Sequence, residues 1–186
     1  HRSARESNCQ IQFAQWPALA PATRWMMDKI PKPSFIHIER EIVRNQMIQI
    51  AAEFRSHWID ELGLCLKWVD SGIHHIEAKQ ISITSGSPTI AHFFIRFDNG
   101  TTATINLHAA ANENRHKRII SSKNELLECD VPDQSVKYGR NSDANRIYFE
   151  KQTFDPTKAA EKAALLFLKS IQLNKETGYT SYDALQ

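Results

Sequence analysis

Apolar residues recur at steps of three and four from residue 34 to residue 60, which is the period of an amphipathic helix. Ser34 is a suitable N-cap, and the helix is expected to end before Gly63. A second helix is predicted over 155–172, because Asp155 is a good N-cap and Pro156 suits the first helical position. The apolar residues of the first helix are Ile38, Ile42, Val43, Met47, Ile50, Ala51, Phe54 and Trp58.

The segment between these helices has the short apolar runs and turn residues typical of strands. Strands are predicted over 64–69, 73–84, 89–98, 101–109, 124–131 and 145–151. A three-residue loop with Gly100 in the left-handed conformation places Ile95 opposite Ala103 and Phe93 opposite Ile105, which gives this hairpin one apolar face. The other face then carries His92, Phe94, Arg96, Thr102, Thr104, Asn106 and His108.

Together these elements predict an α+β fold with an antiparallel sheet of about four to six strands. The long helix at 34–60 and the C-terminal helix are expected to cover one face of the sheet. Residues 34–174 form the single predicted domain. Residues 1–33, broken by four prolines but rich in apolar side chains, are expected to be an arm packed on the domain, and residues 175–186 a tail.

Composition excludes several classes of protein. The chain has 186 residues, 41% of them hydrophobic, and a formal net charge of +2, so it is neither a disordered chain nor a strongly basic nucleic-acid coat. It contains no glycine-rich phosphate loop and no run of eighteen apolar residues. The three separated cysteines, Cys9, Cys65 and Cys129, predict reduced thiols and a cytoplasmic location.

Four consecutive basic residues, Arg115, His116, Lys117 and Arg118, form the strongest local charge. Clustered cations neutralise phosphates or acidic protein surfaces. We therefore expect a basic loop that contacts a nucleic-acid or protein partner, although a solvated charge run is the simpler explanation. The polar hairpin face, with His92, Arg96, Asn106 and His108, is the second candidate binding surface, because neighbouring histidines bind metals or exchange protons near neutral pH.

A third set of residues could carry catalysis. Glu77 and Lys79 project from the same side of a predicted strand, and Asp70 lies at the preceding turn. This arrangement resembles the Asp…Glu-x-Lys core of the PD-(D/E)xK nuclease superfamily. The resemblance implies that Asp70 and Glu77 bind Mg²⁺ and that Lys79 assists phosphodiester hydrolysis. An ordinary cross-strand ion pair is the competing interpretation.

The sequence thus leaves two functions open. The first is a binding domain, with no cofactor, excised from a larger protein such as a bacterial effector, mobile-element or secretion-system protein. The alternative is a magnesium-dependent nuclease of the PD-(D/E)xK type. No motif decides whether the protein is an enzyme, and the oligomeric state stays open.

Overall fold

The computed structural model describes residues 6, 7, 9, 16–43, 50–83, 88–141 and 146–175. Parts of the predicted arm and nearly all of the predicted tail therefore lie outside the described residues. The elements in chain order are α2 (Trp16–Leu19), α3 (Pro21–Lys29), β1 (Phe35–Val43), α4 (Ile50–Val69), β2 (Ile73–Ile81), β3 (Ile90–Phe97), β4 (Thr102–Ala111), β5 (Arg115–Ser121), β6 (Glu125–Asp130), β7 (Ser135–Asn141), β8 (Ile147–Thr153), a short 3-10 turn η1 (Pro156–Lys158) and α5 (Ala159–Gln172).

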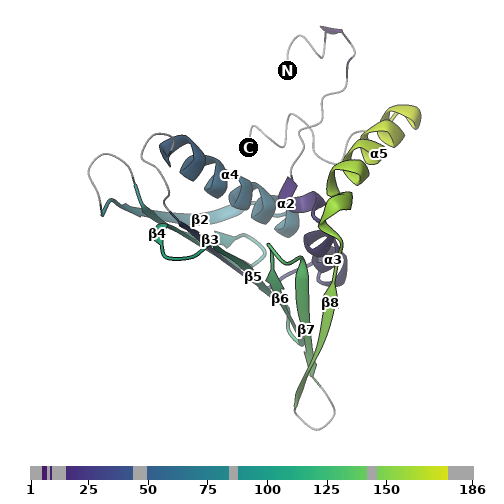
Figure 1. Cartoon of the computed structure of the whole chain (residues 1–186). Coiled ribbons are helices and arrows are strands. Elements are labelled where there is room, and N and C mark those ends of the chain that lie inside the picture. Colours follow the sequence, from purple (N-terminus) through teal and green to yellow (C-terminus); the bar gives the residue numbers. More distant parts are fainter. Residues whose placement is uncertain are drawn as a thin grey trace.

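The strands form one twisted sheet of eight, in the order β2-β3-β4-β1-β5-β6-β7-β8 (Figure 1). Strand β1 lies inside the sheet, parallel to β4 and antiparallel to β5, and the other neighbouring strands are antiparallel. The predicted antiparallel sheet of four to six strands is therefore wrong, because the sheet is larger and mixed. The parallel β1–β4 pair arises because α4, β2 and β3 lie between these two strands in the chain.

The predicted helix over 34–60 is also wrong. Its first part is strand β1, in which Ile36 and Ile38 face the core with exposed fractions of 1% and 0%. A short apolar pattern fits both periods, and the alternation of apolar and polar residues in Phe35–Val43 is that of a strand. The helix α4 begins at Ile50 and continues through the predicted strand 64–69 to Val69.

Helices α3 and α4 cover one face of the sheet. Trp58 of α4 packs on Phe93 of β3 with ring centroids 5.3 Å apart, and the Trp68 indole donates a hydrogen bond to the Ile30 carbonyl at 2.8 Å. The predicted hairpin register is confirmed: Ile95 lies opposite Ala103, and Gly100 has a φ of 86°. These contacts form one apolar core between the sheet and the two helices.

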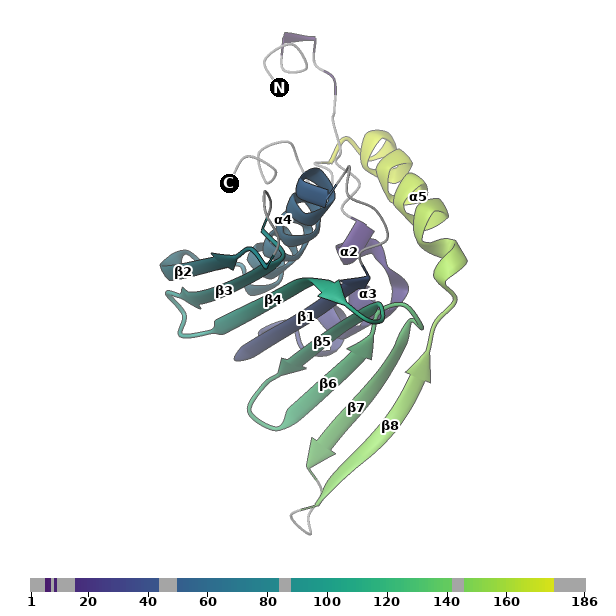
Figure 2. The same ribbon diagram turned by 60° about the vertical axis from the view of Figure 1, so that its left-hand side comes forward.

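The helix α5 does not cover the sheet as predicted. It follows β8 and leans away from the strands beside α2 (Figure 2). Among its described side chains Ala163 and Ser170 are buried and Phe167 is partly exposed, whereas four large apolar side chains are exposed: Leu165, Leu166, Leu168 and Ile171. None of the described helices is long and apolar enough to cross a membrane.

Replacement of Ile38 by alanine tests the central place of β1. Ile38 is completely buried, so Ile38→Ala is expected to lower the free energy of unfolding by roughly 2–5 kcal/mol in a urea titration. The matched control is Ile76→Ala on β2, where the side chain is 48% exposed and the expected loss is below about 1 kcal/mol. If both substitutions lower the free energy of unfolding by the same amount, the buried, central position of β1 is contradicted.

Candidate active site at the interface of helix α4 and strands β1 and β5

The largest group of buried ionisable side chains in the described part of the chain lies between α4 and the centre of the sheet. Arg40 of β1 and His116 of β5 are cross-strand neighbours, and Arg118 lies two residues further along β5 on the same face. Glu61 projects from α4 onto this face. Its carboxylate brings the two strands and the helix together.

Glu61 and Arg118 form a fully buried ion pair. Arg118 donates from Nε to Glu61 Oε2 at 3.0 Å and from Nη2 to Glu61 Oε1 at 2.7 Å. A third bond runs from Arg118 Nη1 to the Thr23 hydroxyl of α3 at 2.7 Å. The exposed fraction of the side chain is 0% for Glu61 and 1% for Arg118. The bidentate geometry satisfies most of the donors and acceptors that burial removes from water.

This pairing sets the charge of the two groups. Burial alone would raise the pKa of Glu61, but the Arg118 charge, the nearby His116 imidazole and the Arg118 hydrogen bonds outweigh burial and hold that pKa far below its usual range. Burial likewise acts to lower the pKa of Arg118, and the Glu61 charge reverses the effect and raises it. Glu61 is therefore an anion and Arg118 a cation throughout the neutral range.

The remaining groups have weaker partners. His116 Nε2 lies 2.9 Å from Glu61 Oε1, but without the alignment of a full hydrogen bond. Burial lowers the pKa of His116, more than the neighbouring Glu61 raises it. Arg40 Nη1 lies 3.9 Å from the same Glu61 oxygen, which is beyond hydrogen-bond length. The Glu61 carboxylate thus has Arg118 as its hydrogen-bonded partner, His116 as a close but misaligned neighbour, and Arg40 as a more distant one.

His57 and Asp60 extend the cluster along α4 toward solvent. They lie four and one residues before Glu61, and both side chains are partly exposed. Burial, together with the charges of Arg40 and His116, lowers the pKa of His57 to about 4, and the Glu61 charge opposes the effect only in part. Burial and the Glu61 charge raise the pKa of Asp60. At neutral pH His57 is a neutral imidazole with a lone pair that can accept a proton.

The two cysteines near this cluster are not nucleophiles. Burial raises the pKa of Cys129 to about 11 and raises that of Cys65 still more, so both thiols stay protonated at neutral pH. Both are free and buried. The cluster can therefore exchange a proton at His57 and attract a charged group, whereas neither buried thiol offers a nucleophile at neutral pH.

The predicted basic loop at residues 115–118 is strand β5. Arg115 and Lys117 face away from α4, whereas His116 and Arg118 face the core, where Arg118 is completely enclosed. Adjacent strand residues point to opposite sides of the sheet, so the four side chains cannot form one binding surface. The prediction of a surface loop therefore misplaced Arg118, which is buried in the core, and His116, which belongs to the cluster beside α4.

The polar hairpin face is present as predicted, on the sheet face turned away from α4. His92 lies opposite Asn106 and is hydrogen-bonded to it, Arg96 lies opposite Thr102, and His108 lies opposite Ile90. Whether this face binds anything stays a prediction.

The predicted metal site is not assembled. Asp70 follows α4, three residues of strand separate Ile73 from Glu77, and the stretch of β2 from Ile73 to Glu77 is roughly 13 Å long. Glu77 instead contacts His75 at 3.0 Å, and Lys79 lies opposite His92. Within the described ranges, no three His, Cys, Asp or Glu side chains are grouped to hold a metal ion.

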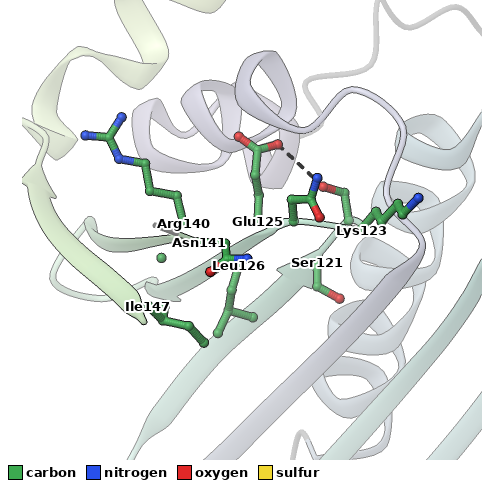
Figure 3. Close-up of a pocket in the computed structure, with 10 residues that line it drawn as sticks. Ser121, Lys123, Glu125, Leu126, Arg140, Asn141 and Ile147 are labelled. Atoms are coloured by element: carbon green, nitrogen blue, oxygen red, sulfur yellow. Dashed lines mark hydrogen bonds between the residues drawn. The ribbon is translucent and has the colours of Figure 1, made fainter. Parts of the chain in front are cut away.

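A pocket of about 410 Å³ lies at the other end of the sheet, where β5, β6 and β7 meet (Figure 3). Lys123 and Arg140 point away from one another there, and Arg140 is paired with Glu150 at 2.8 Å. The Glu125 carboxylate accepts hydrogen bonds from Tyr138 and from Ser122. Since its charges diverge or are already paired, this pocket is a weaker candidate than the α4 cluster.

No protein-family model matches the sequence, and no curated protein is similar to it in sequence. Solved structures nevertheless match the fold closely. UDP-N-acetylglucosamine 3-dehydrogenase from Acidithiobacillus ferrooxidans superposes with a TM-score of 0.87 at 13% identity, over 97% of this chain and 60% of the enzyme. A dehydrogenase from Clostridium difficile gives 0.80 at 11% identity, over 99% of this chain and 61% of the other. Levoglucosan dehydrogenase in complex with NADH and levoglucosan gives 0.78 at 10% identity, over 100% and 63%.

This chain therefore has the fold of a part of these dehydrogenases and spans about 60% of their length. The finding corrects the predicted function: a binding domain for nucleic acid or protein, and a PD-(D/E)xK nuclease, are both wrong. It also corrects the predicted absence of a cofactor and the alternative of Mg²⁺, because the matched structures include an NAD-binding oxidoreductase from Klebsiella pneumoniae and an NADH complex.

The described residues do not fit the dinucleotide phosphates. Such a site uses a glycine-rich turn between a parallel strand and a helix. Here Gly100 closes the β3–β4 hairpin, Gly72 lies against Asp98, and Gly139 of β7 lies against Phe149 of β8. The whole sequence also lacks a GxGxxG motif. The described residues thus contain the α4 cluster but no glycine-rich cradle for the cofactor phosphates.

Sequence reasoning missed Arg40, His57 and Glu61. A signal was available at Glu61, which follows Trp58 by three residues and precedes Cys65 by four, and so lies on the apolar side of α4. A charged residue on an apolar helix face requires a buried partner. Arg118 carries the same signal in β5, two residues before the buried Ile120.

Removal of the Glu61 charge tests the pairing at the centre of this site. Glu61→Gln leaves Arg118 buried beside a neutral amide, so the free energy of unfolding is expected to fall by about 3–5 kcal/mol in a denaturant titration. Glu77→Gln, at a carboxylate with 71% of its side chain exposed, should change it by less than about 0.5 kcal/mol.

A double replacement separates charge from packing. Glu61→Leu combined with Arg118→Met removes both charges, so it is expected to be more stable than Glu61→Gln alone. If Glu61→Gln is as stable as the unmodified protein, the buried ion pair is not what holds α4 to β5.

Proposed function

We propose that this chain is the sheet-forming portion of a nicotinamide-dependent oxidoreductase that acts on a hydroxyl group of a sugar-type substrate. The observation that carries the proposal is the superposition of almost the whole chain on one part of several dehydrogenases, with a TM-score of up to 0.87. Two of those enzymes are named for sugar substrates, UDP-N-acetylglucosamine and levoglucosan.

The cofactor is proposed to be bound by a separate portion, equivalent to the 40% or so of the matched enzymes that this chain does not span. The absence of a glycine-rich turn among the described residues supports this division. The sheet portion then supplies the substrate side of the active site.

His57 is the proposed proton acceptor. Oxidation of an alcohol to a carbonyl removes a hydride from carbon and a proton from the hydroxyl oxygen, and a neutral imidazole can take that proton. His57 has the required properties: it is partly exposed and its low pKa keeps it unprotonated at neutral pH. Asp60, one helical turn further along α4, is placed on the same side of the helix.

The free thiols support a cytoplasmic location for this oxidoreductase. Cys9, Cys65 and Cys129 are unpaired, although Cys9 is exposed and open to oxidation. In the proposed cytoplasmic location, the enzyme would use the cytoplasmic pool of nicotinamide cofactor.

Replacement of His57 tests the proposed role in the longer protein that contains the cofactor-binding portion. His57→Asn is expected to lower kcat for substrate oxidation by about 10²–10⁴-fold, because asparagine cannot accept the proton. Absorbance of the reduced nicotinamide measures the rate.

The matched control is His74→Asn on β2, where 60% of the histidine side chain is exposed. It should leave kcat within about twofold of the unmodified enzyme. If none of the sugars tested reduces NAD⁺ or NADP⁺, the proposed oxidoreductase function is refuted. Full activity of His57→Asn would refute only the role of His57.

A further inference from the structure

Arg40 is a mostly buried cation whose hydrogen-bond donors have no close acceptor in the described part of the chain. Only 22% of its side chain is exposed, and its one ion-pair contact is Glu61 at 3.9 Å. Guanidinium has five N–H donors. Among the described residues, His116 Nε2 is the buried side-chain nitrogen without a hydrogen-bond partner, and no Arg40 nitrogen is in that state, so the free donors of Arg40 reach solvent. An acceptor from outside the protein can therefore approach them.

Glu61 does not supply the missing acceptor. Both of its oxygens already accept hydrogen bonds from Arg118 at 3.0 Å and 2.7 Å, and His116 occupies the space 2.9 Å from Oε1. Since the Glu61 charge is neutralised by Arg118, the positive charge of Arg40 is left without a close counterion. Asp60 is the other carboxylate whose charge acts on Arg40, and the ion pair that Arg40 makes among the described residues is with Glu61, not with Asp60.

The Arg40 guanidinium lies on the same side of the sheet as the proposed proton acceptor. Arg40 Nη1 lies 3.9 Å from Glu61 Oε1, and His57 precedes Glu61 by four residues, one turn of α4, so both side chains flank the Glu61 carboxylate. In keeping with this placement, burial first and then the Arg40 charge lower the pKa of His57. Arg40 also lies directly opposite His116 in the β1–β5 pair. A substrate whose hydroxyl reaches His57 would place its other substituents near Arg40.

We propose that Arg40 binds an anionic group of the substrate, a phosphate or a carboxylate attached to the sugar, and so selects acidic sugars over neutral ones. This inference rests on the proposed oxidoreductase function and adds the substrate class. Planar guanidinium matches the oxygen pairs of phosphate and carboxylate, and the partial burial of Arg40 strengthens the contact.

A binding experiment on this chain tests the proposal without catalysis. The probes are N-acetylglucosamine 1-phosphate, glucuronate and neutral N-acetylglucosamine, and the readout is the NMR titration of the His57 imidazole. An anion on Arg40 cancels part of the field that depresses His57, so either acidic sugar is expected to raise the His57 midpoint above about 4, whereas the neutral sugar leaves it there. The acidic sugar that raises the His57 midpoint more shows whether Arg40 prefers a phosphate or a carboxylate.

Arg40→Gln is expected to raise the His57 midpoint by itself and to abolish the response to both acidic sugars. Arg40→Lys keeps the charge and should retain a weaker response. The matched control is Arg115→Gln on the opposite face of β5, which should respond like the unmodified chain. An equal response in Arg40→Gln, or no response to either acidic sugar in the unmodified chain, would overturn the proposal.

Kinetics in the longer protein separate this inference from the proposed function. Arg40→Gln is expected to raise KM for an acidic sugar by roughly ten- to hundredfold and to leave KM for a neutral sugar unchanged. Oxidation of neutral and acidic sugars with the same KM, before and after Arg40→Gln, would refute the role of Arg40 while leaving the oxidoreductase intact.

Discussion

The bidentate ion pair between Glu61 and Arg118 is the interaction on which the rest of the site depends. It joins α4 to β5, and the bond from Arg118 to Thr23 adds α3 to the same unit. Because the pair consumes both Glu61 oxygens, it also decides what is left over: a neutral His116, a partly exposed His57 and the free donors of Arg40. A buried pair of this kind is costly to break, which fixes the helix against the strands within a narrow range of positions.

The register of a hairpin could be predicted from the sequence, whereas the pairing of strands that lie far apart in the chain could not. The register of the β3–β4 hairpin followed from parity and from Gly100, since a one-residue slip would expose Phe93 and Ile95. Strand β1 was mistaken for a helix, because nine residues with apolar positions at 36, 38 and 42 fit either period. Whether β1 pairs with β4 is decided by contacts far apart in the chain, which a local pattern does not contain.

The site was harder to predict for the same reason. Arg118 was read as part of an exposed basic run, although its neighbours Arg115 and Lys117 are on the other side of the strand. Arg40, Glu61 and Arg118 are separated by 21 and 57 residues, and only the packing of α4 across β1 and β5 brings them together. Under the proposed oxidoreductase function, this group of charges is the substrate side of an active site as well as a stabilising network.

The central claim is that the sheet portion presents a sugar hydroxyl for oxidation by a nicotinamide cofactor bound elsewhere. It is tested most directly by isotope transfer in the longer protein. A sugar deuterated at the carbinol carbon is incubated with NAD⁺ or NADP⁺, and the cofactor is analysed by mass spectrometry. The account predicts deuterium in the reduced cofactor. An oxidised sugar with no deuterium in the cofactor, or no oxidised sugar at all, would contradict it.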